Sequence, residues 1–148
     1  MDETAPVLVV GLNDGPGAAA ALRWAVQEAR LHEARIRAVY AYSEPVVADI
    51  SMVPPDQAQR LEQAQRAAEL WCASALEGLA GLFGIPVEVV VQVGPPGPVL
   101  VQASENALML VVGGRRRHAL HRLLHGSVGH YCLNHATCPV VAVPVPQR

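Results

Sequence analysis

The sequence has few aromatic residues, few charged residues and no long uninterrupted apolar run. Aromatic residues make up 4% of the 148 residues and charged residues 16%, whereas hydrophobic residues make up 51%. A disordered chain has the opposite balance, so this composition excludes disorder and predicts one packed core. No stretch approaches the roughly 20 apolar residues that span a bilayer, so the sequence predicts no membrane segment.

Cysteine is also scarce, and its pattern bears on the compartment. Cys72, Cys132 and Cys138 form no C-x-x-C pair, and an odd number argues against a disulfide framework. Cys132 and Cys138 are predicted to be buried packing residues. Residues 1–4 lack the basic and apolar regions of a signal peptide, which predicts a cytoplasmic protein. The net charge of −2 gives no general attraction to nucleic acid or to anionic membrane.

Short apolar runs alternate with segments of helical periodicity along the chain. Strands are predicted at 7–10, 36–42, 87–93, 108–112 and 139–143, and helices over 18–29, over 56–82, after 94–98 and after 126–127. This alternation predicts a single α/β domain, residues 1–148. Right-handed crossovers would place helices on both faces of a five-stranded parallel sheet, giving a three-layer α/β/α sandwich. Glu88 and Gln92 interrupt the third strand, which places it near a sheet edge.

Parallel sheets bind ligands beyond the carboxyl ends of their strands, which draws attention to loops 13–17, 43–55 and 113–127. Gly113 ends a predicted buried strand, where a missing side chain lets a ligand approach the backbone. Ser127 is suited to cap the following helix, whose free N–H groups form an anion site. These features suggest a phosphate cradle. Alternatively, the glycine only ends a strand and the serine only caps a helix.

The chain resembles the universal stress protein family over essentially its whole length. The stretches that carry the resemblance are Val9–Gly11, Ala21–Ala25, Leu110–Gly113, Leu123–Val128 and His135–Val143. The resemblance implies a Rossmann-like fold of the HUP type and a role in the stress response. Members of the family are commonly dimeric, and some bind ATP.

One departure from the family pattern concerns the phosphate-binding motif. ATP-binding members carry G-x2-G-x9-G-[ST], which here begins at Gly113 and ends at Gly126 and Ser127, with Arg116 in place of the second glycine. Gly114 comes two positions too early to replace it. Arg116 either obstructs the phosphate path or binds phosphate through its guanidinium group. The sequence leaves both alternatives open.

The remaining site residues are assigned through the same resemblance. It implies that Asn13 and the backbone near Ala41 contact adenine and ribose, and that Gly113, Gly126, Ser127 and Val128 contact the phosphates. Where the family usually has aspartate, Asn13 carries no charge and adds a hydrogen-bond donor. We therefore expect weak binding of ATP or a related adenine nucleotide, with Mg²⁺ as its accompanying cation.

Other chemistries are disfavoured by what the sequence omits. His121 and His125 have helical i, i+4 spacing, but no cysteine or carboxylate stands at a metal-ligand spacing from them. The arginines at 115–117 have no interleaved aromatic residues, which argues against nucleic acid. The G-x-S-x-G, G-x-x-x-x-G-K-[ST] and H-x-G-H motifs are absent, which predicts that the protein is not an enzyme.

Two functions remain open after these exclusions. The first is a stress-response regulatory protein that binds ATP or a related adenine nucleotide. The alternative is a nucleotide-independent dimeric interaction module in which Arg116 fills the pocket. In either case the apolar strand at 139–143 lies at a sheet edge in the family topology. We expect this edge to pair two subunits in a homodimer.

Overall fold

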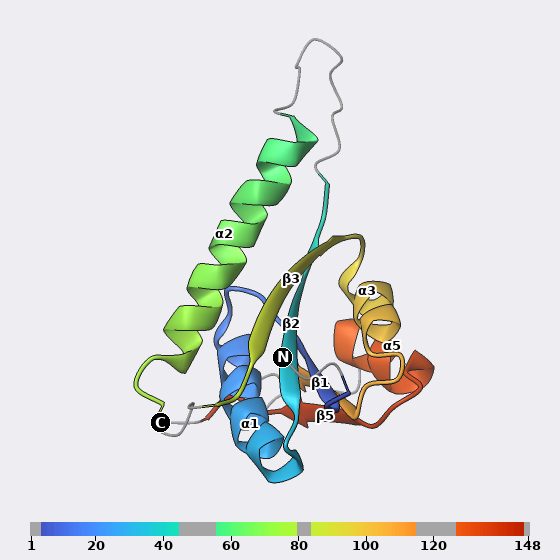
Figure 1. The fold of residues 1–148 in the computed structure, drawn as a ribbon. Coiled ribbons are helices and arrows are strands. Elements are labelled where there is room, and N and C mark those ends of the chain that lie inside the picture. The colour runs from blue at the N-terminus through green and yellow to red at the C-terminus, as the bar shows by residue number, and fades with distance from the viewer. Residues whose placement is uncertain (1–3, 45–55, 80–83, 115–126, 147–148) are drawn as a thin grey trace.

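A computed structural model describes residues 4–44, 56–79, 84–114 and 127–146 of the chain (Figure 1). Five parallel strands form one sheet in the order β3-β2-β1-β4-β5. The strands are β1 (Val7–Gly11), β2 (Arg35–Tyr42), β3 (Val87–Val93), β4 (Met109–Gly113) and β5 (Val140–Val143). The described helices are α1 (Pro16–His32), α2 (Gln57–Leu76), α3 (Pro96–Ala103) and α5 (Ser127–His135). The predicted α/β sandwich is confirmed.

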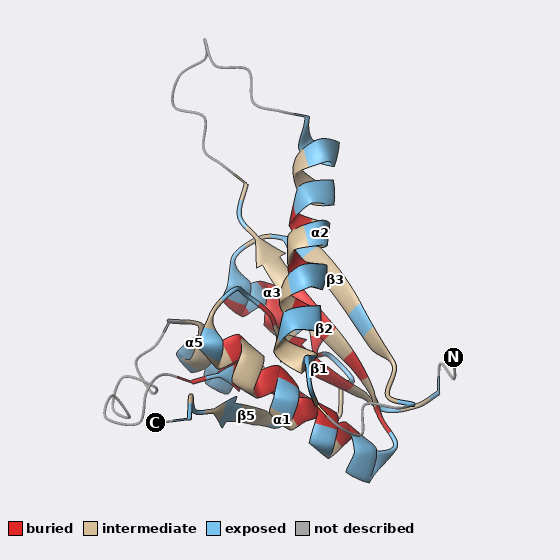
Figure 2. Ribbon diagram, turned by 90° about the vertical axis from the view of Figure 1, so that its left-hand side faces the viewer, coloured by how far each residue is buried: buried red, intermediate tan, exposed pale blue. Residues whose placement is uncertain are grey.

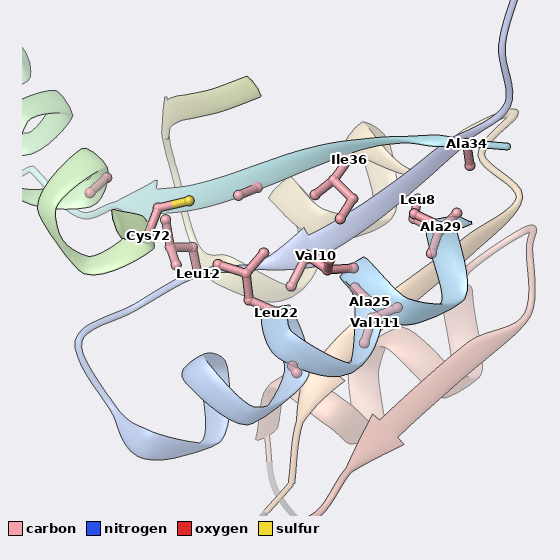
Figure 3. Close-up of a cluster of buried hydrophobic side chains, with 14 residues drawn as sticks. Leu8, Val10, Leu12, Leu22, Ala25, Ala29, Ala34, Ile36, Cys72 and Val111 are labelled. Atoms are coloured by element: carbon pink, nitrogen blue, oxygen red, sulfur yellow. The ribbon is translucent and has the colours of Figure 1, made fainter. Parts of the chain in front are cut away.

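Helices cover both faces of the sheet, which explains why its central strands are apolar throughout. Side chains alternate along β1, so Leu8 joins a core cluster with α1 and α2, which Figure 3 shows, while Val9 joins a second cluster with α3 and α5. Figure 2 shows that the buried residues concentrate on β1 and on one face of α1, whereas much of α2 is exposed. All five strands run in the same direction, and α1, α3 and α5 each come after a strand in the chain. The first turns of these three helices therefore lie at the same end of the sheet, beyond the carboxyl ends of the strands.

The second helix is shorter than predicted. It ends at Leu76 rather than near residue 82, because Glu77 leaves the helical region with ψ 132° and Gly78 takes the left-handed conformation with φ 73°. Arg23 of α1 stabilises this end, since its Nη1 donates to the carbonyl oxygens of Ala75 at 3.2 Å and Glu77 at 3.4 Å. A tertiary contact thus satisfies carbonyl groups that the helix itself leaves unpaired.

The sheet edges and the cysteines can be compared with the sequence predictions. The strand β3 lies at one edge, as expected, and Glu88 is exposed there. Cys132 is fully buried, and burial raises its pKa. The prediction of a buried Cys138 was wrong: this residue is only partly buried, because it lies in the turn that leads into the other edge strand, β5.

The length and polarity of the helices also bear on membranes. Among the helices in the part of the chain that the structure describes, none is long and apolar enough to cross a bilayer.

Candidate functional site

A cavity of about 420 Å³ opens at the carboxyl ends of β1 and β4. The chain leaves β1 for α1 on one face of the sheet and leaves β4 toward α5 on the other face, so the cavity lies at the switch point of the strand order. Its wall includes the first turns of α1, α3 and α5. The wall thus carries the free N–H groups and positive ends of three helices, an arrangement that favours an anionic ligand.

The helix ends provide this positive potential without charged side chains. None of the described residues that line the cavity is acidic or basic. At the start of α1, the N-cap residue Gly15 makes no side-chain cap hydrogen bond, so the N–H groups of Gly17 and Ala18 at the cavity wall depend on an external acceptor. The attraction for anions at this wall is therefore a property of the backbone.

Asn13 lines the cavity, as the family resemblance implied. Its Oδ1 accepts a hydrogen bond of 2.7 Å from the backbone N–H of Gly15, which closes the turn between β1 and α1. This hydrogen bond uses the side-chain oxygen of Asn13, which leaves the Nδ2 group of the side chain to donate to a ligand. Asp14 is exposed and does not line the cavity, so the asparagine rather than the aspartate faces the site.

The backbone of Ala41 supplies a donor and an acceptor at the opposite wall. Leu12 donates from its N–H to the carbonyl oxygen of Val39 at 2.8 Å, so the peptide groups of Val39 point toward β1. Backbone groups alternate in direction along a strand, so those of Ala41 point the same way. Because β1 ends at Gly11, opposite Val39, the N–H and carbonyl of Ala41 face the cavity instead of a strand.

Gly113 lines the cavity, but its missing side chain has a different purpose from the predicted one. A Cβ on Gly113 would lie 2.3 Å from the carbonyl carbon of Gly17 and 2.8 Å from the nitrogen of Ala18. No real Cβ tolerates such contacts, so the end of β4 accommodates the first turn of α1 only because residue 113 is glycine. The glycine thus serves the close approach of two protein segments in the first place.

Four of the residues chosen from the sequence therefore meet at one cavity: Asn13, Ala41, Gly113 and Val128. Arg116 and Gly126 lie outside the described residues. Ser127 is the first helical residue of α5, whereas an N-cap residue stands immediately before a helix, so its capping role stays a prediction. Sequence reasoning missed the contribution of α3, whose Pro96 and Leu100 also line the cavity. The prolines at the start of α3 marked a helix N-terminus, but its position at the site depends on the crossover from β3 to β4.

The positions of histidine, cysteine and carboxylate side chains bear on metal binding. Across residues 4–44, 56–79, 84–114 and 127–146, no group of three or more histidine, cysteine, aspartate or glutamate side chains could hold a metal ion. His121 and His125 lie outside these ranges.

A parallel α/β/α sandwich with helix N-termini around the switch point of its sheet defines a Rossmann-like α/β domain. Within that class, the model of the universal stress protein family matches residues 6–144. The chain belongs to this family, which confirms the resemblance drawn from the sequence.

Curated relatives support the same assignment. A universal stress protein of Mycolicibacterium smegmatis is 33% identical over 139 residues, which cover 92% of this chain and 47% of the relative. A universal stress protein of Mycobacterium tuberculosis is 31% identical over 138 residues, covering 92% of this chain and 46% of the relative. The chain thus spans about half the length of these relatives.

Solved structures share the fold at lower identity. A universal stress protein in complex with cAMP has a TM-score of 0.64 at 20% identity, covering 96% of this chain and 98% of that one. An Archaeoglobus fulgidus universal stress protein in complex with dAMP has a TM-score of 0.59 at 19% identity, with 94% and 97% covered. An Arabidopsis thaliana family member with AMP bound has a TM-score of 0.57 at 20% identity, with 95% and 92% covered. These structures establish the fold.

The contact between β4 and α1 predicts unequal costs for two glycine substitutions. We expect Gly113→Ala to lower the free energy of unfolding by about 3 kcal/mol, because rigid backbone faces the added methyl group. In Gly17→Ala the methyl group would lie 3.1 Å from the carbonyl oxygen of Gly114. Alanine also favours the helix, so a change below about 1 kcal/mol is expected. Urea unfolding measures both, and a Gly113→Ala variant as stable as Gly17→Ala would refute the close contact.

Proposed function

We propose that this chain is a regulatory protein of the stress response that binds ATP or a related adenine nucleotide, accompanied by Mg²⁺. Residues 1–148 form one domain, and the protein acts in the cytoplasm. The observation that carries the proposal is the cavity at the switch point, which combines helix N-termini with the outward-facing peptide groups of Ala41. The helix N-termini suit the phosphate groups of a nucleotide, and the peptide groups of Ala41 suit its base.

The size of the cavity and the known ligands of similar folds support a nucleotide. A volume of about 420 Å³ falls within the range of about 300–1,000 Å³ that is usual for small-molecule sites. The three structures named above hold cAMP, dAMP and AMP, and all three ligands contain adenine. These ligands share an adenine base and a phosphate group, and the cavity has peptide groups suited to the base and helix N-termini suited to the phosphate.

The base is recognised by the peptide groups of Ala41. Adenine presents an acceptor at N1 beside a donor at its 6-amino group. The N–H of Ala41 can donate to N1 while its carbonyl oxygen accepts from the amino group, since both face the cavity. Guanine in the same pose would set donor against donor and acceptor against acceptor. The Nδ2 group of Asn13 supplies one more donor, which suits a ribose hydroxyl oxygen.

The phosphates bind at the helix ends. The N–H groups of Gly17 and Ala18 in α1, and the first turn of α5 at Val128, lie at the cavity wall. Their partial positive charges are suited to phosphate oxygens. In this proposal Gly126 and Ser127 extend the cradle, and Arg116 reduces its affinity because it replaces the second glycine of the motif.

The lining favours binding over catalysis. None of the described lining residues places a carboxylate, imidazole, thiol or amine in the cavity. Tyr40 also borders the cavity, but its ring belongs to the core cluster on the face of α1 and α2. There it packs edge-on against Trp71, with 4.9 Å between the ring centroids. General acid–base chemistry needs such a group within hydrogen-bond reach of the substrate. We therefore propose a binding protein without enzymatic activity.

Calorimetric titration with ATP, AMP and GTP tests the nucleotide site. We expect saturable binding of ATP and AMP, and binding of GTP at least about tenfold weaker, which corresponds to about 1.4 kcal/mol. The difference arises because guanine reverses both hydrogen bonds at Ala41. Equal affinities for ATP and GTP would refute recognition through Ala41. A chain that binds none of the three nucleotides would instead be a nucleotide-independent interaction module.

Replacing Arg116 with glycine tests whether this residue obstructs the phosphate site. We expect Arg116→Gly to tighten ATP binding about 5- to 150-fold, or about 1–3 kcal/mol, because the substitution removes bulk and restores the glycine of the motif. The matched control is Arg117→Gly, which removes the same charge one position away. Weaker binding in Arg116→Gly alone would show that the guanidinium binds phosphate. Equal changes in both variants would mean that only the charge of the loop matters.

A second part of the proposal concerns assembly through β5. Leu110 donates its N–H to the carbonyl oxygen of Pro139, and Gly114 donates to that of Val143. Because direction alternates along a strand, the peptide groups of Val140 and Ala142 point away from β4. They form an open edge at the end of the sheet. We propose that two subunits pair antiparallel along this edge around a two-fold axis.

Ala142→Pro tests this pairing because it removes an outward N–H and leaves the hydrogen bonds to β4 intact. Proline is tolerated on an edge strand whose N–H faces outward. We expect wild-type protein to be dimeric and Ala142→Pro to be monomeric at micromolar concentration in light scattering. The control Ala142→Ser keeps the N–H and should remain dimeric. A monomeric wild type, or an unchanged mass for Ala142→Pro, would refute pairing through β5.

A further inference from the structure

A second hollow lies at the amino-terminal end of the sheet, at the other end of β1 and β2 from the nucleotide cavity. It has a volume of about 360 Å³ and is lined by residues 4–7, by Arg35 and Arg37, and by residues 103 and 105–107. It shares no lining residue with the cavity at the switch point. Along β2 the hollow reaches to Arg37 and the cavity begins at Val39, and two residues of a strand span about 7 Å.

Two arginines of β2 enter the wall of this hollow side by side. Arg35 and Arg37 are two residues apart on one strand, so their side chains lie on the same face of the sheet. Arg37 is already engaged, since its Nε donates to Oε2 of Glu88 on β3 at 3.2 Å. Arg35 differs, because its Nε is buried and has no hydrogen-bond partner within the part of the chain that the structure describes.

The other charged residues around Arg35 do not supply an acceptor for its Nε–H. Glu105, in the turn between α3 and β4, lines the same hollow, and Arg30 and Glu33 line a neighbouring hollow on which Arg35 also borders. The described wall of the first hollow thus carries two guanidinium groups and one carboxylate. Glu105 and Glu88, the partner of Arg37, balance the charge of the two guanidinium groups, but the buried Nε of Arg35 still lacks an acceptor among the described residues. A buried donor is normally paired, because leaving it unpaired costs free energy.

We propose that Arg35 and Arg37 form a second binding site, for the carboxylate or phosphate group of a small anionic molecule. A guanidinium group presents its N–H donors in a planar fork that matches two oxygens of one oxyanion. The Nε–H of Arg35 would donate to one oxygen of the ligand. The Nη groups of Arg37, whose Nε holds Glu88, would complete the contact.

A small molecule fits this site better than a bare ion. The hollow of about 360 Å³ is larger than one oxyanion needs, and Glu105 and Asn106 at its wall offer an acceptor and an amide to the rest of the ligand. A ligand that carries a hydroxyl or amino group beside its anionic group would contact both ends. This site is independent of nucleotide binding, because it uses no residue of the switch-point cavity.

The direct test follows the Nε–H signals of the arginines by NMR in the ¹⁵N-labelled protein of residues 1–148. Succinate and inorganic phosphate are titrated at constant ionic strength, and the Arg35 signal is assigned by its absence from Arg35→Lys. We expect saturable movement of the Arg35 signal with at least one of these anions, and no movement of the Arg66 signal. Succinate alone as ligand would identify a carboxylate site, phosphate alone a phosphate site. Without a response of Arg35 in the wild type, the proposal is overturned.

Variants separate the specific contact from general charge. Arg35→Gln should weaken binding at least tenfold, and Arg35→Lys several-fold, since lysine keeps the charge but loses the planar fork. The control Arg66→Gln removes one charge from an exposed pair on α2 and should leave binding unchanged. If Arg35→Gln does not fold, Arg37→Gln provides the same comparison. Equal losses in Arg35→Gln and Arg66→Gln would overturn the site.

Discussion

The contact between the backbones of Gly113 and Gly17 determines where α1 begins relative to the sheet. A Cβ at residue 113 would overlap the first turn of α1, at 2.3 Å from the carbonyl carbon of Gly17. Because this turn lies directly against the end of β4, its N–H groups face the switch point rather than solvent. The proposed anion site depends on this close approach, since no charged side chain is found among the described lining residues of the cavity.

The two proposed sites at the two ends of the sheet would hold an anion in different ways. At the carboxyl end the positive potential comes from backbone dipoles, which are fixed in direction and need no counter-ion of their own. At the amino end the proposed site relies on guanidinium groups, of which Arg37 already pairs with Glu88 while the Nε of Arg35 lacks a partner among the described residues. A site built from arginine forks is better suited to selecting the shape of an oxyanion.

Much of the fold could be predicted from local patterns, and the exceptions have tertiary causes. The apolar strands and the helical stripes reflect burial on both faces of the sheet, so their periodicity is visible in the sequence. The end of α2 was misplaced because the carbonyl groups of Ala75 and Glu77 are satisfied by Arg23, from another helix. Cys138 was misjudged because its exposure depends on the edge position of β5.

Some features of the candidate site could likewise be predicted from the sequence, and others could not. The sequence by itself determined the family and the order of strands and helices along the chain. Through the family resemblance it also pointed to Asn13, Ala41, Gly113 and Val128 as candidate site residues. Only the tertiary structure decided that Gly113 is needed for contact with Gly17, and that Pro96 of α3 joins the cavity. The unpaired Nε of Arg35 was likewise invisible in the sequence. Such features depend on distances between segments far apart in the chain, and a one-dimensional pattern does not contain those distances.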